Sequence, residues 1–261
     1  MSIINTHKKK IIAASIIIAL VLIWELLMPL DYSGGKEPLW GVTFSTSQAE
    51  YLGLDWKQAY LATLDDLGVR AVRLSAYWNA IERVRGEYDF SDLDWQIAEA
   101  TKRHVRIILA VGRRLPRWPE CHDPEWVRDK GTESNHSEKV TIVINSEQVK
   151  NVTEDRLRGF VTKVVERYRG NPSISMWQVE NEFFLNTFGE CPIRSSDELK
   201  NEIALVRGLD SRPILVTDSG ELSTWRKVAP LGEYLGTTMY RIVWNPVTGY
   251  LNYKYILPPL L

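Results

Sequence analysis

The segment VRIILAVG, residues 105–112, decides the fold class of this chain. It holds six apolar residues and a single charge, Arg106, and it ends at Gly112. A continuous apolar run of this length is typical of a strand buried on both faces, as in the parallel sheets of α/β proteins. Such a strand needs helices packed against it, so the sequence on either side should carry helical patterns.

Strand-like and helix-like segments do alternate on both sides of this run. In Asp55–Leu67, for example, apolar residues recur at the spacing of one helical face. The predicted strands are Leu39–Ser45, Arg70–Trp78, Val105–Gly112, Ile174–Glu182, Pro213–Asp218 and Tyr234–Tyr240. The predicted helices are Asp55–Leu67, Ser91–Arg103, Thr153–Arg169, Ser196–Arg207 and a short one near Trp225–Ala229. Residues 245–261 show no seventh strand–helix unit.

This alternation predicts parallel strands, because each crossover helix returns the chain to the same edge of the sheet. A doubly wound open sheet and a (β/α)8 barrel both fit the pattern. The open sheet usually has a glycine-rich phosphate loop after its first strand, and residues 44–48, FSTSQ, contain no such motif. We therefore expect an α/β fold of the (β/α)8 TIM-barrel type, incomplete at about six βα units and spanning residues 39–261.

The N-terminal residues predict a membrane anchor. Lys8, Lys9 and Lys10 precede an uncharged run, Ile11–Trp24, and apolar residues continue to Leu30. About 20 residues suffice to cross a bilayer as a helix, and the lysines should stay in the cytoplasm. A cleaved signal peptide is the alternative, but the run ends in bulky residues without a small-x-small site. We expect an uncleaved anchor in residues 1–30, a linker in 31–38, and the barrel domain on the extracytoplasmic side.

Composition excludes some classes of function. The net charge is −1, and Lys and Arg are scattered along the chain, which argues against nucleic-acid binding. The four histidines show no metal-ligand spacing, so neither a metal nor another cofactor is expected. In an oxidising compartment Cys121 and Cys191 could form a disulfide, although two unpaired, partly buried thiols fit the sequence as well.

The ends of the predicted strands carry the residues suited to chemistry, because barrel active sites lie at the carboxyl ends of the strands. Asn181 and Glu182 end the fourth strand, and Trp78 with Asn79 follows the second. A carboxylate beside an amide, with aromatic and arginine side chains around it, suits a sugar. Hydroxyl groups need fixed polar partners, and sugar faces need flat apolar ones.

Two motifs carry a resemblance to a known group of enzymes. WQVENE, residues 177–182, and YWNAIERVRGEYDFSDLDWQI, residues 77–97, resemble the retaining glycoside hydrolases of clan A, which include families 5 and 42. The resemblance covers roughly Trp40–Trp244. It implies that Glu182 is the general acid/base and that Asn181 contacts the sugar 2-hydroxyl.

Further roles follow from the same resemblance or from residue type. By resemblance, Arg73 lies beneath the nucleophile and Tyr240 supports it. Trp78, Trp118 and Trp244 are candidate sugar platforms, and core or lid packing is an equal alternative for each. Glu180 alternates with Glu182 along the predicted strand, so both could face the same side, with Glu180 as a supporting or structural carboxylate.

A retaining mechanism needs two carboxyl groups about 5–5.5 Å apart. In clan A the nucleophile is a Glu that ends strand 7, for which this sequence offers no counterpart. The chain is then truncated, or an incomplete and inactive barrel, or it uses a substitute, for which Glu221 is the one candidate.

The sequence thus predicts hydrolysis of β-linked glycosides by a retaining mechanism, with little or no turnover if the chain is complete as given. A non-catalytic, membrane-tethered carbohydrate-binding barrel is the first alternative. A membrane-bound α/β protein whose sheet serves only assembly is the second.

Overall fold

The computed structural model describes residues 2–27, 37–128, 146–220, 223–240, 242–245 and 249–252. The chain divides into two compact units. One is Leu39–Arg241, and the other comprises Met1–Pro38 together with Ile242–Leu260. The candidate site lies wholly in the first of them, which we call the sheet unit.

The sheet unit is built on six parallel strands in the order β1-β2-β3-β4-β5-β6. Their bounds are β1 Gly41–Thr43, β2 Ala71–Ser75, β3 Arg106–Val111, β4 Ile174–Val179, β5 Ile214–Asp218 and β6 Tyr234–Thr237. Each strand pairs with its neighbour in the sequence, and β1 does not pair with β6 in the described chain. The sheet is therefore a half-barrel, as the repeated βα units predict.

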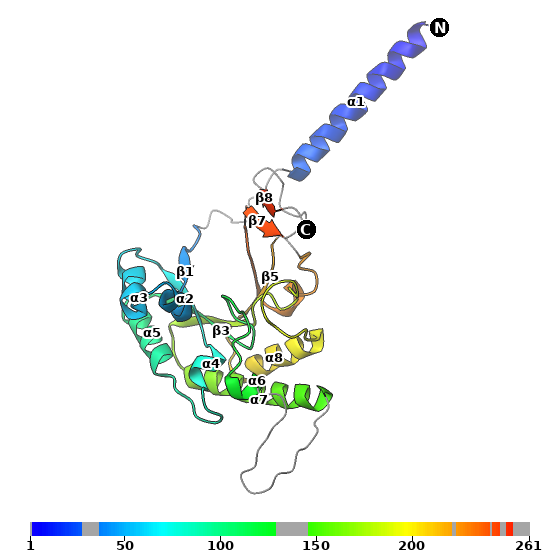
Figure 1. The fold of residues 1–261 in the computed structure, drawn as a ribbon. Helices are drawn as coiled ribbons and strands as arrows, with labels where there is room; N and C mark the ends of the chain where they lie inside the picture. Colours follow the sequence, from blue (N-terminus) through cyan, green and yellow to red (C-terminus); the bar gives the residue numbers. More distant parts are fainter. Residues whose placement is uncertain are drawn as a thin grey trace. The chain divides into compact units, whose positions relative to one another are not determined.

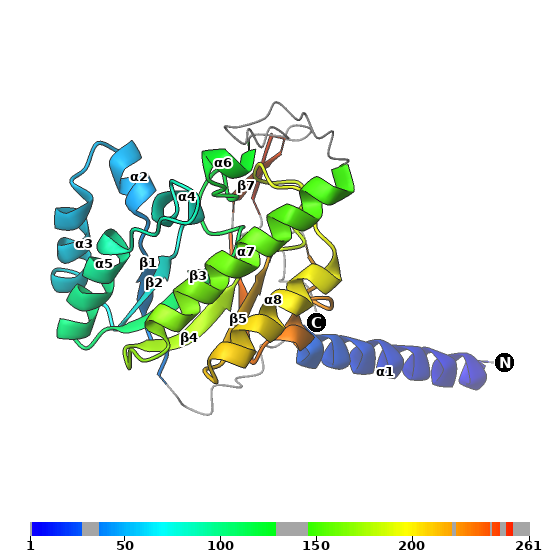
Figure 2. The same ribbon diagram turned by 90° about the horizontal axis from the view of Figure 1, so that it is seen from below.

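Helices cover one side of this sheet, and Figures 1 and 2 show α3, α5, α7 and α8 forming an arc along it. The helices are α1 Ser2–Leu27, α2 Thr46–Tyr51, α3 Trp56–Asp65, α4 Trp78–Ile81, α5 Ser91–Lys102, α6 Glu125–Arg128, α7 Ser146–Tyr168, α8 Ser196–Leu209 and the 3₁₀ turn η1 Ala229–Leu231. Local signals fix several of their ends. Asp55 caps α3, and Ser195 with Glu198 forms a capping box at α8.

The core lies between the strands and the helix arc. Leu109 in the middle of β3 and Trp177 in β4 are fully buried, and so are Tyr60 of α3 and Phe160 of α7. Fully burying side chains of this size stabilises a fold by about 1.5–3 kcal/mol each. The large apolar residues of four different elements thus hold the strand ends at fixed positions.

Three points of the sequence analysis need correction here. Within the ranges that the structure describes, no helix is long and apolar enough to cross a membrane, so the predicted transmembrane helix is not supported. Beyond β6 the chain forms an antiparallel hairpin of β7 Ile242–Asn245 and β8 Gly249–Asn252, which the sequence patterns did not indicate. The sixth strand is also shorter than expected, since it ends at Thr237 rather than Tyr240.

Candidate active site at the carboxyl ends of the strands

Glu182 lies three residues beyond the end of β4. Its backbone N–H donates to Oγ1 of Thr217 on β5 at 2.9 Å, and Oγ1 of Thr238, just after β6, donates to its Oε1 at 3.3 Å. The residue is 9% exposed and has a left-handed backbone with φ of 44°. Residues at the ends of three adjacent strands thus meet at Glu182.

The surroundings of Glu182 favour its protonated form. Burial raises the pKa of Glu182 above its usual value, and the negative charge of Glu120 raises it further. The hydrogen bond from Thr238 and the charge of Arg114 oppose this shift, and Asp218 adds to it. A carboxylic acid that keeps its proton towards neutral pH can act as a general acid.

A directed chain of hydrogen bonds runs beside this carboxyl group. Arg73 on β2 donates from Nη1 to Oε1 of Gln178 at 3.0 Å, and Nε2 of Gln178 donates to Oδ1 of Asn181 at 3.2 Å. Nδ2 of Asn181 then donates to Oε2 of Glu120 at 3.1 Å, an atom that also lies 3.2 Å from Nε of Arg114. Arginine can only donate, so both side-chain amides have one allowed orientation.

Glu180 faces a different environment from Glu182, which corrects the expectation that the two could share one face. β4 ends at Val179, and Glu180 also has a left-handed backbone, with φ of 59°, so the strand alternation stops before it. Its carboxylate accepts from the backbone N–H groups of Arg113 and Arg114 at 3.0 and 2.6 Å. It also pairs with Arg194 at 2.5 Å, and its side chain is fully buried. Glu180 is thus placed to anchor the loop after β3.

Arg194 binds three carboxylates from three elements. Besides Glu180, it contacts Glu154 of α7 through two nitrogens, at 3.0 and 2.7 Å, and Glu202 of α8 at 3.0 Å. Burial and the charge of Glu180 together raise the pKa of Glu202 well above its usual range, although Arg194 opposes this. We call these four residues the Arg194 cluster. Through its three ion pairs, the cluster joins α7 and α8 to the segment after β4, two residues before Glu182.

Gly112 explains how the Arg194 cluster fits against β3. A Cβ atom at this position would lie 2.8 Å from Cδ of Glu180 and 2.8 Å from Oε1 of Glu202. Its φ of +132° is also a conformation that other residues rarely adopt. A glycine is therefore required where β3 turns into the loop that carries Arg113 and Arg114.

A disulfide holds the two loops that border the site. Cys121 and Cys191 are bonded, with their Cα atoms 5.2 Å apart, and they join the loop after β3 to the loop after β4. The backbone N–H of Glu190 also donates to the carbonyl of Pro119 at 2.9 Å. Glu120 immediately precedes Cys121, so the disulfide is adjacent to Glu120 in the sequence.

The structure separates the predicted aromatic residues. For Trp78, the structure supports the core alternative over the sugar platform: this residue opens α4, is fully buried, and stacks on Phe160 at 5.6 Å. Its ring faces are therefore covered. Trp118 is 59% exposed and packs edge-on against the half-exposed Phe188 at 5.7 Å. Its role as a sugar platform stays a prediction.

The other predicted binding residues are exposed or belong to another part of the chain. Asn79 is exposed on α4, and Tyr240 is 62% exposed beyond β6. Trp244 belongs to β7, which is outside the sheet unit. Glu221, the predicted substitute nucleophile, lies outside the described residues.

Sequence reasoning missed Glu120 and Gln178, both of which are hydrogen-bonded to Asn181. They come from a long loop and from a strand interior, where no periodic pattern marks them. The one available signal was the position of Glu120 beside Cys121, because a bond to Cys191 would carry it towards the loop after β4. Across the described part of the chain, no group of three or more His, Cys, Asp or Glu side chains is arranged to hold a metal ion.

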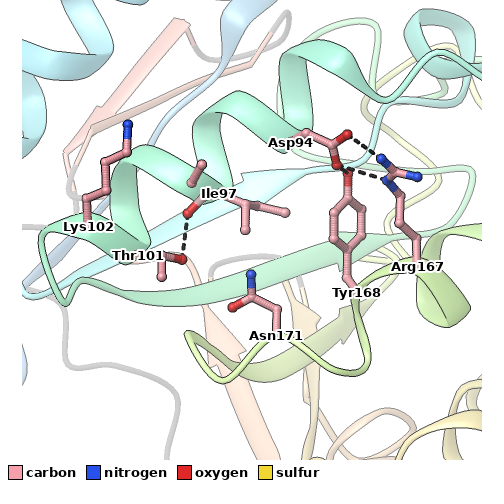
Figure 3. A pocket seen from close by; sticks show the side chains of 8 residues that line it. Asp94, Ile97, Thr101, Lys102, Arg167, Tyr168 and Asn171 are labelled. Carbon is pink, nitrogen blue, oxygen red and sulfur yellow. Dashed lines mark hydrogen bonds and ion pairs between the residues drawn. The ribbon is translucent and has the colours of Figure 1, made fainter.

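A separate surface hollow of about 590 Å³ lies between α5 and α7, on the helix layer (Figure 3). Asp94, Arg167 and Tyr168 line it, and Figure 3 shows the Arg167 guanidinium and the Tyr168 hydroxyl both directed at the Asp94 carboxylate. These polar groups satisfy one another. The hollow is formed by helices and not by the strand ends, so it is distinct from the site around Glu182.

Comparison with known proteins supports a glycosidase fold. The model of glycoside hydrolase family 42, described as beta-galactosidase, matches residues 54–199. Beta-galactosidase BgaA of Clostridium cellulovorans is 29% identical over 179 residues, which cover 65% of this chain and 26% of BgaA. The chain thus spans about a quarter of that relative's length.

Solved structures agree on the fold. A beta-galactosidase from Bacillus circulans sp. alkalophilus superposes with a TM-score of 0.56 at 16% identity, covering 80% of this chain and 41% of that one. The exo-beta-1,4-mannosidase Op5Man5 from Opitutaceae bacterium strain TAV5 gives a TM-score of 0.51 at 15% identity, covering 74% and 35%. At these identities the likeness concerns the fold alone.

Proposed function

Because this chain belongs to glycoside hydrolase family 42, we propose that its sheet unit hydrolyses terminal β-galactosides by a retaining mechanism, with Glu182 as the general acid/base. The observation that carries the proposal is the buried Glu182 carboxyl, which accepts from Thr238 and has a raised pKa, on a backbone held by Thr217. The choice of galactose rests on the names of relatives from Clostridium cellulovorans, Halorubrum lacusprofundi and Lactobacillus acidophilus, which are called beta-galactosidases.

The chemistry assigned to Glu182 has two halves. In the first, its carboxyl proton passes to the glycosidic oxygen as the bond from that oxygen to the anomeric carbon breaks. A second carboxylate must attack the carbon from the opposite face, and the six-stranded sheet of the described residues offers no strand-7 glutamate for that step. In the second, the Glu182 carboxylate takes a proton from water, and the water oxygen displaces the enzyme carboxylate. The acid is thereby regenerated, and the sugar leaves with its original anomeric configuration.

Asn181 and Arg73 are the proposed binding partners around this reaction. Asn181 precedes Glu182, and Arg73 is connected to Asn181 through Gln178. We propose that the Asn181 amide binds the sugar 2-hydroxyl and that Arg73 keeps the floor of the site positively charged. Trp118 and Tyr240 remain proposed contacts at the rim. Both are more than half exposed, as a side chain that meets an entering sugar must be.

The proposal is tested with nitrophenyl β-glycosides of galactose, glucose and mannose. We expect hydrolysis of the galactoside in preference to the other two. NMR of the sugar product as it first forms should show that the anomeric configuration is retained. Inversion would contradict the retaining mechanism. Binding of methyl β-galactoside without hydrolysis of any substrate would instead support a non-catalytic carbohydrate-binding barrel.

We further propose that the sheet unit works in an oxidising, extracytoplasmic compartment. Cys121 and Cys191 are bonded, and structural disulfides persist in such compartments and are rare in the cytosol. Chain isolated from its host in the presence of an alkylating agent should show no labelled cysteine until a reductant is added. Labelling of both thiols before reduction would place the protein in a reducing compartment instead.

A further inference from the structure

Glu120 has a place at the candidate site that neither strand periodicity nor family resemblance assigns to it. It is 4% exposed and comes from the loop after β3, yet its carboxylate meets Asn181 and Arg114. We propose that Glu120 is a positioning residue, which fixes the Asn181 amide for the sugar and sets the charge beside Glu182. This inference rests on the function proposed for Asn181 and Glu182.

The hydrogen-bond directions support the first part of the role. Asn181 donates one Nδ2 hydrogen to Glu120, and its Oδ1 accepts from Gln178. An amide nitrogen carries two hydrogens, so the second stays available for a ligand oxygen, with no partner in the described structure. Without an acceptor at position 120, the hydrogen bond from Gln178 alone would keep the amide nitrogen, rather than the oxygen, turned towards the loop.

The charges around Glu182 support the second part. The groups that act on it are Glu120 and Arg114 from the loop after β3, Arg73 from β2 and Asp218 from β5. Glu120 exerts the largest effect of these charges. A carboxylate there opposes ionisation of Glu182, because two like charges in a poorly solvated site repel each other. Arg114 limits this effect by pairing with Glu120.

The loop backbone holds Glu120 rigidly enough for such a role. Its N–H donates to the Arg117 carbonyl at 2.7 Å, and its carbonyl accepts from Leu115 at 2.8 Å. Gly189, on the loop after β4, leaves the space that the side chain needs. A Cβ there would lie 2.9 Å from Cβ of Glu120. The neighbouring disulfide keeps the two loops together.

Two substitutions separate the charge of Glu120 from its hydrogen bonding. Glu120→Gln removes the charge and keeps an acceptor for Asn181, whereas Glu120→Met removes both at similar size. Glu190→Gln is the matched control, because it removes a carboxylate from an exposed residue of the adjoining loop. The full chain is used throughout, and a dispersed NMR spectrum verifies that each variant is folded.

The first readout needs no ligand. With ¹⁵N-labelled asparagine, we expect the two Asn181 side-chain hydrogens to have widely separated resonances, in the wild type and in Glu120→Gln. In Glu120→Met the pair should collapse towards the shifts of a free amide. With ¹³C-labelled glutamate, the Glu182 titration should move to lower pH in Glu120→Gln and stay in place in Glu190→Gln. Unchanged Asn181 resonances in Glu120→Met, or an unchanged Glu182 titration in Glu120→Gln, would overturn the inference.

The second readout separates failure of the inference from failure of the proposed function. Wild-type chain should bind methyl β-galactoside about tenfold more tightly than its 2-deoxy analogue, the loss expected for one hydrogen bond. Glu120→Met should lose that preference, and Glu120→Gln should retain it. If the wild type shows no preference, the role of Asn181 in the proposed function fails. If the wild type shows it and Glu120→Met keeps it, only the role of Glu120 fails.

Discussion

Glu182→Gln is expected to lower the turnover of aryl β-galactosides by about 10²–10⁴-fold, the usual contribution of a positioned general acid/base. Glutamine keeps the size of the side chain and can still accept from Thr238. It has no proton to give to the leaving oxygen, so the loss should be largest for substrates whose leaving group needs protonation. Steady-state kinetics with nitrophenyl and methyl β-galactosides measure the difference.

The pH dependence of activity provides an independent test of the role of Glu182. Burial and Glu120 raise the pKa of Glu182, so its acid form persists to higher pH than that of an ordinary glutamate. Activity that depends on this proton should fall as the pH rises through that raised value, and Glu182→Gln should abolish this alkaline limb. Wild-type turnover of methyl β-galactoside by Glu182→Gln would exclude Glu182 as the acid. The surface variant Glu190→Gln should behave as wild type.

Arg194→Met is expected to destabilise the sheet unit by about 3–5 kcal/mol at neutral pH, because removing one partner leaves buried charges unpaired. Arg194 is 6% exposed and is the cation that Glu154, Glu180 and Glu202 share. Urea unfolding followed by fluorescence measures the change. Because burial and the charge of Glu180 raise the pKa of Glu202, this carboxylate can take up a proton, and the penalty should shrink as the pH is lowered.

Arg207→Met is the matched control for this experiment. Arg207 is also paired with a glutamate, Glu233, but both side chains are nearly half exposed. Pairs of that kind contribute about 0–1 kcal/mol. Equal losses of unfolding free energy in Arg194→Met and Arg207→Met would show that the Arg194 cluster stabilises the fold no more than an exposed ion pair does.

Periodic apolar segments were predictable from the sequence because their burial repeats along the chain. The order of six strands and the four long helices of the sheet unit follow from such patterns, and α8 begins at Ser196 as expected. Shorter elements such as α2, α4 and α6 span six residues or fewer, so no period can mark them. α7 begins earlier than predicted because its first turns are polar.

The site was predictable only in part, because most of its contacts join distant residues. Asn181 and Glu182 follow a recognisable strand, which placed them at its end. Trp78 was misplaced because β2 ends at Ser75, and the three-residue difference turns the indole into the core. Glu120 is 61 residues from Asn181 in the sequence, and local patterns do not reveal such a contact.

The left-handed backbone at Glu180 and Glu182 has a consequence for engineering. For a residue with a Cβ atom this conformation costs roughly 1–2 kcal/mol, and glycine or asparagine adopts it more easily. A library selected for heat resistance alone would therefore drift towards Gly or Asn at position 182, since that change relieves the backbone. Thermostable clones should be screened for activity in the same round, or the selection will discard the side chain that we propose as the general acid/base.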